Sequence, residues 1–562
     1  MAKGPRIVVV GGVATGPKAA ARARRLCPEA EIAIVEQGEY VSYGGCGLPF
    51  YLSGVVGKIE GLMTTLSGQV RDVHYFLSEK NVTVLIRTRA ERLDRAQKRL
   101  HVRDLRNGDL SALSYDKLVL ATGATPTRPP VPGVELGNVF NLRTPADAIA
   151  LRRLVEERKG AHFTIVGGGL IGLETADALV ARGAEVTILE LTDHLLPGLL
   201  DGDVARLLER HLEREGVDVR LSTPLAHLVG DEEGNVCRAV AGDEEIETSA
   251  VIIGTGLKPN VQLAKDAGLE LGVTGGILVD DFLRTSDEDV YAGGDCAEIA
   301  HAVSGRKVIF PLGTVANRHG RIIGGNVVGG HERFSGALGT TAMQVLEFNV
   351  GRTGLGETQA HAAGFQVETA FVPTMDTAHF HPLHAPITVK LVADTASRRL
   401  LGAQVVGPGE AIKRVDVAAM AISLGATVDQ LAEADLGYAP PFASAIDAIA
   451  QTANICRDKL DGLAHSWSVE KLRQRLVAGE NLALIDVRTP AESRQGSGIG
   501  RPCLRIPLGE LRQRLGEVPR DVPVVAICAL GTRSYEAQRL MLGAGLKDVC
   551  FLEGGLAAWS GR

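Results

Sequence analysis

The feature that most constrains the fold of this chain is a pattern of strand, glycine turn, helix and second strand that occurs twice. In the first copy, the apolar run Arg6–Val10 leads into Gly11 and Gly16, and a helix is expected over 17–26. The next apolar run ends in an acid, Glu36. Such glycines allow the backbone to approach a pyrophosphate, the helix N-terminus favours the anion, and the acid binds ribose hydroxyls. The pattern therefore predicts a dinucleotide-binding βαβ unit.

The second copy is complete, whereas the first has Val13 in the place of the middle glycine. The second copy begins at Phe163, and its glycines and acid are Gly167, Gly169, Gly172 and Glu190. No arginine follows Glu190 within four residues, which favours NADH, with NADPH still possible. Two units in this context predict two dinucleotide-binding domains, and the alternative for either copy is a packing turn that binds no ligand.

Composition excludes several classes of protein. With 45% hydrophobic residues and a formal net charge of −7, disorder is excluded as the dominant state and nucleic acid is not an expected partner. No apolar run approaches the ~18 residues of a membrane span. The N-terminal residues resemble a strand and a turn rather than a signal peptide, so we expect a cytoplasmic protein. The eight cysteines include no C-x-x-C pair, which leaves single-thiol chemistry.

Later segments extend the pattern of the two units. Tyr115–Gly123 and Ala250–Gly256 are each expected to form a strand that ends in a glycine turn, and Thr285–Asp295 reads T-S-x-x-x-x-Y-A-x-G-D. Together these motifs resemble the flavoprotein disulfide reductases over roughly residues 5–450. The resemblance implies FAD at the first site, with Asp295 on its ribityl chain, and a helix that begins near Ala316 and points its N-terminus at the flavin.

The resemblance assigns a set of residues to each cofactor. Those expected to contact FAD are Gly11, Gly16, Glu36, Thr122, Gly123, Asp295 and Ala316. Those expected to contact the nicotinamide cofactor are Gly167, Gly169, Gly172, Glu190 and Gly256.

Cys46 has the context of a reactive thiol, because glycines flank it and an apolar, helix-like stretch follows. A thiolate at a helix N-terminus is stabilised by the helix dipole and free N–H groups. No second cysteine follows within five residues, which excludes an internal dithiol cycle. The run S-[aromatic]-x-x-C-G-L-P from Ser42 resembles the single-cysteine branch of the family, with its CoA disulfide reductases, persulfide reductases, and NADH oxidases and peroxidases. The alternative is a buried packing cysteine.

A second candidate thiol, Cys528, follows an apolar strand and begins a six-residue loop that ends at Arg533. Backbone N–H groups of such a loop can converge on a thiolate. With Leu484–Arg488 upstream and Leu552–Trp559 downstream, the whole segment resembles a rhodanese domain. The resemblance implies a loop that suits a single sulfane sulfur, and the alternative is an inert scaffold.

The resemblance also suggests where CoA could bind. CoA-using relatives direct polar residues of the first glycine-turn helix toward the CoA phosphates, which singles out Arg22 and Arg25, although a solvated helix face is the alternative. They anchor the CoA thiolate with two tyrosines of the partner subunit. Tyr438 matches one, but His381 or Phe380 replaces the other.

A further departure is the glycine before Cys46, where CoA disulfide reductases usually carry asparagine. Together with the missing tyrosine, it weakens CoA disulfide as the preferred substrate. The histidines around His381 have no common zinc spacing, so no metal site is expected. The residues expected to bind substrate are Ser42, Arg22, Arg25, Asn317 and His381.

The expected fold class is α/β: two Rossmann-like domains for FAD and NAD, an α+β dimerisation domain, and a C-terminal α/β rhodanese domain. One of the strands expected in the dimerisation domain covers Ala342–Phe348. The expected segments are 1–145 (FAD domain, first part), 146–255 (NAD domain), 256–330 (FAD domain, second part), 331–452 (dimerisation domain), 453–466 (linker) and 467–562 (rhodanese domain).

The expected function is that of a homodimeric, FAD-dependent NADH:persulfide or polysulfide reductase. Cys46 would attack a persulfide of CoA or another small thiol, and electrons would pass from NADH through FAD to release sulfide. Cys528 would capture or relay the sulfur, since a sulfur-moving module is of no use to a peroxidase. CoA disulfide reduction, NADH oxidase or peroxidase activity, and a sulfur-carrier role remain alternatives. The residues expected to be catalytic are Cys46, Cys528, Arg533 and Tyr438.

Overall fold

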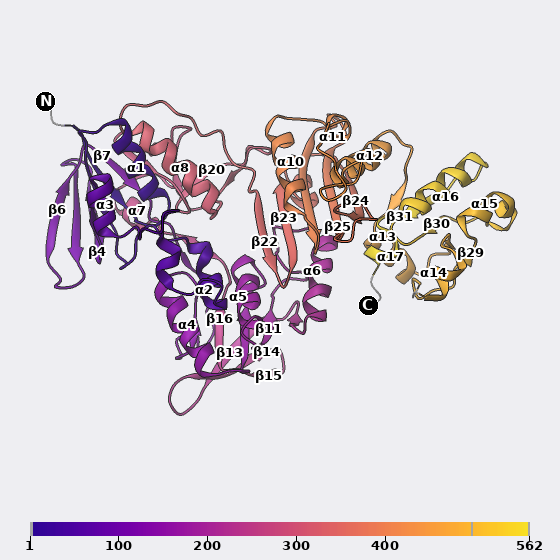
Figure 1. Ribbon diagram of the computed structural model, residues 1–562, viewed down its shortest axis with the longest axis horizontal. Helices are drawn as coiled ribbons and strands as arrows, with labels where there is room; N and C mark the ends of the chain where they lie inside the picture. The colour runs from indigo at the N-terminus through magenta and orange to yellow at the C-terminus, as the bar shows by residue number, and fades with distance from the viewer. Residues whose placement is uncertain (1–3, 496–497, 560–562) are drawn as a thin grey trace. The chain divides into compact units, whose positions relative to one another are not determined.

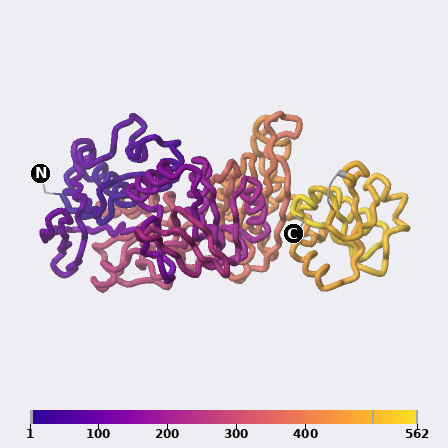
Figure 2. Tube along the Cα trace, turned by 90° about the horizontal axis from the view of Figure 1, so that it is seen from below, coloured from indigo at the N-terminus to yellow at the C-terminus, as the bar shows by residue number. Residues whose placement is uncertain are grey.

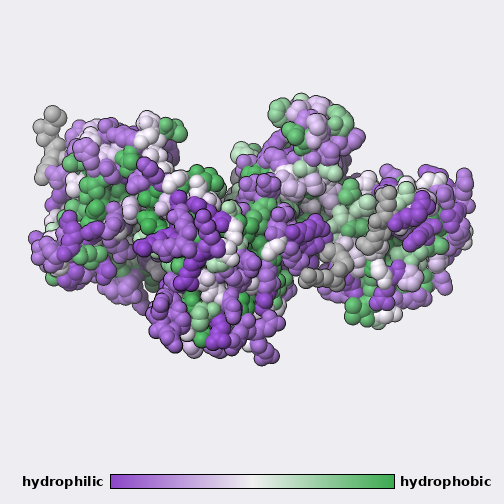
Figure 3. Space-filling view, turned by 60° about the horizontal axis from the view of Figure 1, so that its bottom comes forward, coloured by the Kyte–Doolittle hydropathy of each residue, from purple (hydrophilic) through white to green (hydrophobic). Residues whose placement is uncertain are grey.

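The computed structural model describes residues 4–495 and 498–559. The chain forms two compact units, whose elements are labelled in Figure 1. The first unit comprises Met1–Asp193 and Gly216–Gly339, and the second comprises His194–Glu215 and Thr340–Arg562. Hydrophilic residues cover much of the face seen in Figure 3, while buried apolar side chains fill the interior of each unit.

The first unit contains a parallel five-stranded sheet of order β19-β7-β1-β2-β3. Its central strands are continuous β-branched and aliphatic runs because a parallel sheet is buried on both faces. The strands are β1 (Arg6–Val10), β2 (Glu31–Val35), β3 (Thr83–Leu85), β7 (Lys117–Leu120) and β19 (Val290–Ala292). Helices α1 (Thr15–Leu26) and α8 (Gly313–Asn326) pack against each other beside this sheet (Figure 1).

The start of α8 differs from the expectation. The helix begins at Gly313, three residues before Ala316, because the backbone is extended only as far as Leu312. Ala316 is therefore a buried residue of the first helical turn rather than its beginning.

A second parallel sheet has the order β12-β11-β10-β16-β9 and repeats the arrangement of the first. Its strands are β9 (Val139–Phe140), β10 (His162–Val166), β11 (Glu185–Leu189), β12 (Asp218–Arg220) and β16 (Ala250–Ile253). Its helices are α4 (Pro145–Glu157), which starts with a capping box between Thr144 and Asp147, and α5 (Leu170–Val180). Both glycine repeats therefore form βαβ units.

Shorter elements complete the first unit. One three-stranded antiparallel sheet consists of β4 (Thr88–Asp94), β5 (Arg99–Asp104) and β6 (Leu110–Ser114). Another consists of β13 (Leu225–Gly230), β14 (Val236–Ala241) and β15 (Glu244–Glu247). The unit's remaining strands are β8 (Ala124–Pro126), β17 (Leu257–Pro259), β18 (Ile277–Leu278), β20 (Ala297–Ala300) and β21 (Lys307–Val308). Its remaining helices are α2 (Leu48–Ser53), α3 (Val73–Lys80) and α7 (Gln262–Asp266), with 3-10 turns at η1 (Gly45–Gly47) and η2 (Ile59–Met63).

The second unit contains an antiparallel sheet of order β22-β23-β26-β25-β24. The strands are β22 (Thr341–Val345), β23 (Phe348–Gly354), β24 (Val367–Met375), β25 (Pro386–Asp394) and β26 (Leu400–Gly407). The helices beside them are α6 (Gly202–Arg214), α9 (Glu357–Ala362), α10 (Ile412–Ser423), α11 (Val428–Ala432) and α12 (Ala448–Leu460). The single strand expected over Ala342–Phe348 is instead a hairpin, because Leu346 and Glu347 adopt positive φ values of 46° and 63° and reverse the chain.

The expected linker over 453–466 is also largely helical. Helix α12 runs through to Leu460 and buries Ala453 and Cys456. Its polar residues made the segment resemble a linker, but they alternate with small apolar residues at helical spacing.

The C-terminal part of the second unit has its own parallel sheet of order β27-β31-β30-β28-β29. Its strands are β27 (Ser466–Trp467), β28 (Ala483–Asp486), β29 (Leu504–Arg505), β30 (Val524–Ile527) and β31 (Val549–Leu552). Its helices are α13 (Val469–Val477), α14 (Pro490–Gln495), α15 (Leu508–Arg514), α16 (Thr532–Gly543) and α17 (Gly555–Ala558), with a 3-10 turn at η3 (Leu515–Glu517). Figure 2 shows this segment in yellow as one compact fold. Among the residues that the structure describes, no helix is both long and apolar enough to cross a membrane.

Candidate active sites

In both βαβ units, close backbone contacts leave no room for a Cβ atom at the same positions of the glycine turn. A Cβ on Gly16 would lie 1.9 Å from the Gly11 carbonyl oxygen, and one on Gly172 would lie 2.1 Å from that of Gly167. Gly11 has a φ of 111° and Gly167 a φ of 107°. A side chain is therefore excluded at these four positions by the protein itself.

The middle position of the turn is different. A Cβ on Gly169 would have as its nearest neighbour the Gly254 carbonyl oxygen, at 3.9 Å, which is ordinary contact. The first copy tolerates Val13 at the same place in its turn. The protein itself therefore does not require glycine at this position.

The acid at the end of each second strand is held against its glycine turn. Glu36 accepts hydrogen bonds from the backbone N–H groups of Gly12 at 2.6 Å and Gly38 at 2.7 Å. Glu190 accepts equivalent bonds from Gly168 at 2.7 Å and Thr192 at 2.8 Å. Each carboxylate therefore stands beside the turn where the ribose of a dinucleotide would lie.

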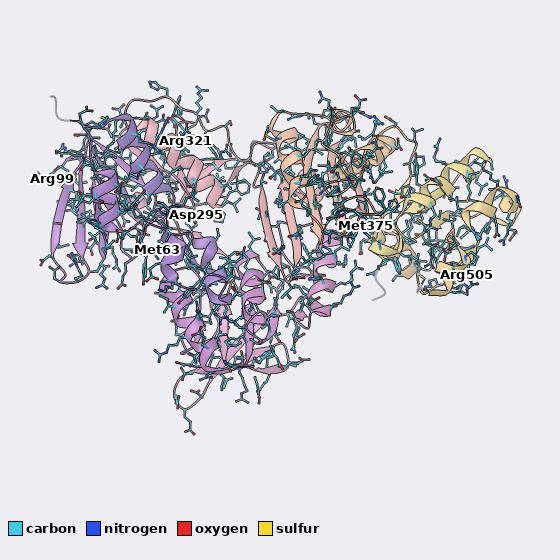
Figure 4. All side chains as sticks on the ribbon, viewed as in Figure 1. Met63, Arg99, Asp295, Arg321, Met375 and Arg505 are labelled. Carbon is cyan, nitrogen blue, oxygen red and sulfur yellow. The ribbon has the colours of Figure 1, made fainter. Side chains whose placement is uncertain are left out.

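The remaining residues expected at FAD lie on loops that follow strands of the first sheet. Thr122 donates its hydroxyl to the Asn260 carbonyl at 2.6 Å, and Gly123 follows it with a φ of 66°. Asp295, labelled in Figure 4, lies shortly after β19 and accepts a hydrogen bond from the Arg143 guanidinium at 3.0 Å. Sequence reasoning missed Arg143, which is far from Asp295 in the chain and belongs to no motif.

The last two residues expected at the cofactors are Ala316 and Gly256, and each accepts a hydrogen bond through its carbonyl. The Ala316 carbonyl accepts a hydrogen bond from the Thr15 hydroxyl at 3.0 Å, which ties α8 to α1. Gly256 follows β16 with a φ of 107°, and its carbonyl accepts the Thr127 N–H at 2.9 Å. The tight glycine turns and the carboxylates beside them fit a dinucleotide at both sites.

Cys46 lies in the turn η1, immediately before α2, and its side chain is exposed. The sequence led us to expect a stabilised thiolate, but the net effect of the surroundings on the pKa of this thiol is in the opposite direction. Although the residue reaches solvent, desolvation by the surrounding protein raises the pKa of Cys46, and the Glu174 carboxylate raises it further. A backbone hydrogen bond lowers the pKa, but this effect is smaller than either of the two that raise it.

Glu174 is a second residue that sequence reasoning missed. It lies on α5 of the second βαβ unit, and burial raises its pKa to about 7, with a contribution from Asp177. A carboxyl group that titrates near neutrality beside Cys46 can hold or release a proton there. The only sequence feature that could have pointed to Glu174 is its position two residues after Gly172 in the glycine motif.

Cys528 is buried at the end of β30, in the loop before α16. Its Sγ accepts a hydrogen bond from the Gly531 N–H at 3.1 Å and lies 3.4 Å from the Ser534 hydroxyl. The N–H groups of Leu556 and Ala557 in α17 donate to the carbonyls of Cys528 and Ala529, each at 2.9 Å. The second half of the C-terminal fold therefore holds the loop in place.

Arg533 does not end the loop as a free cation. Its guanidinium donates two hydrogen bonds to the Glu492 carboxylate of α14, at 2.6 and 2.8 Å. This pairing raises the pKa of Arg533 and holds that of Glu492 far below its usual range. Glu492 was not predicted, since it lies far from Arg533 in the sequence.

The residues expected to bind substrate are divided between the two units. In the first unit, Ser42 is buried, Arg25 is exposed, and Arg22 pairs with Glu332 at 3.3 Å. Asn317 is exposed near the N-terminal end of α8, and its amide donates to the Gly313 carbonyl at 2.8 Å.

Two further expected residues, Tyr438 and His381, lie on loops of the second unit. Tyr438 is half exposed, and the His381 carbonyl is 2.6 Å from Nδ1 of His384. The structure describes each unit by itself and does not place these two side chains against Cys46.

Comparisons with protein families agree with this architecture. Residues 5–320 match the pyridine nucleotide-disulphide oxidoreductase family, and residues 340–450 match the dimerisation domain of the same family. Residues 468–562 match the rhodanese-like domain. The chain belongs to the pyridine nucleotide-disulphide oxidoreductases, which use FAD and NAD(P)H, and it carries a C-terminal rhodanese-like domain.

Three relatives define the similarity more narrowly. The NAD(P)H coenzyme A polysulfide/persulfide reductase of Pyrococcus horikoshii is 35% identical over 80% of this chain and 98% of its own. The structure of an NAD-dependent persulfide reductase from A. fulgidus has a TM-score of 0.93 at 42% identity, covering 99% of this chain and all of its own. Reduced Bacillus anthracis CoADR-RHD has a TM-score of 0.92 at 33% identity, covering 99% of this chain and 97% of its own.

Proposed function

We propose that this chain is a FAD-dependent NADH:persulfide or polysulfide reductase. The observation that carries the proposal is the presence of two different thiol sites in one chain. Cys46 is exposed in the dinucleotide-binding unit, whereas Cys528 is buried in a loop in which the Gly531 N–H donates a hydrogen bond to its sulfur. Exposure suits attack on a substrate, and the loop suits storage of one extra sulfur atom.

The first glycine turn, Glu36 and the Arg143–Asp295 pair are proposed to hold FAD. The second turn and Glu190 are proposed to hold the nicotinamide cofactor, and the missing arginine after Glu190 favours NADH. Bound FAD would supply the electron transfer that connects the nicotinamide to sulfur at Cys46.

The proposed sulfur step uses Cys46 as nucleophile. Its thiolate attacks the outer sulfur of R–S–SH, so that a Cys46–sulfur bond forms, the original S–S bond breaks and R–S⁻ leaves. The products are Cys46–S–SH and the thiolate, and this exchange requires no net oxidation. Because the pKa of Cys46 is raised, Glu174 is proposed to act as proton acceptor when the thiolate forms.

Cys528 is proposed to capture or relay the sulfur as its own persulfide, with the Gly531 N–H stabilising the charge. For a CoA carrier, Ser42, Arg22, Arg25 and Asn317 are proposed contacts in the first unit. In this proposal Arg22 exchanges its bond to Glu332 for a phosphate, which binds a guanidinium more strongly than an exposed carboxylate does.

The chain is proposed to act as a homodimer through its second unit. Large apolar side chains are exposed there, including Phe380, Leu383, Tyr438 and Phe442, and a surface of this kind calls for a covering partner. Tyr438 and His381 would then belong to the contact region and could meet a substrate at the partner's site. The proposed domain division keeps the expected boundaries, except that α12 continues the dimerisation domain to Leu460.

The deciding experiment measures anaerobic NADH oxidation and sulfide release with CoA persulfide and CoA disulfide at equal concentrations. The proposal expects fast persulfide turnover that yields one sulfide per NADH. Cys46→Ser is expected to abolish it, while Cys27→Ser, as a control at a partly buried cysteine outside the proposed sites, leaves it unchanged. Fast disulfide turnover with slow persulfide would show a CoA disulfide reductase instead.

Two further outcomes would also overturn the proposal. NADH oxidation that needs oxygen and no sulfur substrate would show an oxidase or peroxidase. Sulfur transfer that continues at full rate without NADH would show a sulfur-carrier protein.

A further inference from the structure

The loop that contains Cys528 carries one charged side chain, Arg533, and that charge is paired. Ala529, Leu530, Gly531 and Thr532 are uncharged. Arg533 makes a two-point contact with Glu492, and the side chains are about one-third exposed, at 32% and 38%. Such a bidentate pair is among the stronger side-chain contacts, and its carboxylate offsets the positive charge that would otherwise attract a second anion.

A second arginine near the loop is also paired. Arg488 donates three hydrogen bonds to Asp486 at 2.8–3.2 Å, and both side chains are buried. Asp486 and Glu492 both act electrostatically on Arg533. The positive charge of these two arginines is thus matched by two carboxylates within the domain.

We propose that Glu492 determines which sulfur donor Cys528 accepts, because it pairs with Arg533 and so disfavours sulfur oxyanions such as thiosulfate. The loop then takes its sulfur from the end of an uncharged thiol arm. This inference rests on the proposed function for the persulfide substrate. CoA is a suitable carrier because its sulfur ends a neutral arm of amide and methylene groups, far from its phosphates.

The two donors differ in the charge that they bring to the loop. With thiosulfate, the Cys528 thiolate attacks the outer sulfur, the bond to the sulfonate sulfur breaks, and sulfite leaves with two negative charges. With R–S–SH, the same attack gives Cys528–S–SH and releases R–S⁻ with one negative charge. Only the first reaction needs a free cation at the loop to stabilise a dianion.

Glu492 can be altered without loss of its structural role. It accepts hydrogen bonds from the N–H of Thr489 at 3.0 Å and from its hydroxyl at 2.7 Å, and so closes the first turn of α14. Glutamine serves in the same capping box. Glu492→Gln therefore keeps the helix start and removes only the charge that binds Arg533.

The test uses the full chain in a Cys46→Ser background, so that Cys528 is the only one of the two proposed thiols that can react. Mass spectrometry monitors the loading of Cys528 as the gain of one sulfur atom. Thiosulfate and CoA persulfide are the two donors. The matched control is Glu510→Gln, which removes a charge from α15 while Arg514 keeps Glu517 as partner.

We expect the parent to load faster from CoA persulfide than from thiosulfate. Glu492→Gln should raise the loading rate from thiosulfate about tenfold, the scale of one charge-assisted hydrogen bond, and change that from CoA persulfide by less than about twofold. Glu492→Asp, which keeps the charge, should behave as the parent does, and so should the control. Thiosulfate loading that equals persulfide loading in the parent, or that does not respond to Glu492→Gln, overturns the inference.

Different measurements test the inference and the proposed function, so that one can be overturned while the other stands. NADH-dependent sulfide release is measured in the enzyme with Cys46 intact. If that activity is absent while donor preference still responds to Glu492, the proposed function fails and the role of Glu492 stands.

Discussion

The carboxylate of Glu190 accepts a hydrogen bond from the backbone N–H of Gly168 at 2.7 Å. Glu36 makes the corresponding bond to Gly12 at 2.6 Å. In both units the acid is therefore oriented by the turn itself. The two turns differ in their middle residue, which is Val13 in one and Gly169 in the other, so the fold itself does not require glycine at this position.

Two alanine substitutions in the second turn should have opposite effects. Gly172→Ala places a Cβ 2.1 Å from the Gly167 carbonyl oxygen, so it should lower the free energy of unfolding by about 1–3 kcal/mol. Gly169→Ala meets no close atom of the protein and should change stability by less than about 1 kcal/mol. It should instead raise the KM for NADH about tenfold, because the methyl group stands where the pyrophosphate approaches. Denaturant unfolding and NADH kinetics measure the two effects, and a large loss of stability in Gly169→Ala would contradict the assignment.

Glu174→Gln should lower the pKa of Cys46, because it removes a negative charge that opposes the thiolate. Alkylation of Cys46 should become about two- to fivefold faster at pH 8. Near pH 6 the difference should shrink, since the wild-type carboxyl, whose pKa is about 7, is then protonated. Labelling of Cys46 at several pH values tests this, with Glu185→Gln, exposed on β11, as control.

The same substitution should alter the pH dependence of stability. The folded-state pKa of Glu174 is raised from 4.5 to about 7, so its contribution to stability is present below about pH 4.5 and is lost as the pH rises through 7. The Tm of Glu174→Gln relative to wild type should therefore rise over this interval. A constant difference would show that the carboxyl group does not titrate there.

Lys459→Met should destabilise the contact between α12 and the C-terminal fold. The Lys459 ammonium pairs with Glu553 at 3.2 Å and with Glu368 at 2.8 Å, and the side chains of Lys459 and Glu553 are each only 7% exposed. Removing the cation leaves the Glu553 carboxylate buried, which costs about 3–5 kcal/mol.

Glu553 directly precedes the glycines that lead into α17, and α17 holds the Cys528 loop. Loading of Cys528 should therefore slow in Lys459→Met, while NADH-dependent reduction at Cys46 should be affected less. Calorimetry and Cys528 loading measure the two effects. Lys547→Met, at an exposed site, is the control, and an unchanged unfolding transition would contradict this role of Lys459.

Motifs with short spacing were predictable from the sequence. Both βαβ units form where the glycines and acids indicated, and the loop from Cys528 to Arg533 lies between a strand and a helix as expected. These patterns depend on residues within about 25 positions of one another, so their geometry follows from local periodicity and turn chemistry. The same reasoning misjudged 453–466, because the polar residues of α12 conceal a buried face.

What the sequence by itself determined is the class of fold, the two dinucleotide turns and the two candidate thiols, because each is written in residues that are neighbours along the chain. Only the tertiary structure decided the environment of those thiols. Arg143 meets Asp295, Glu492 meets Arg533, and Glu174 raises the pKa of Cys46. Each of these pairs is formed by chain folding over many intervening residues, and charge and burial, which set reactivity, depend on distances in space that no local pattern encodes.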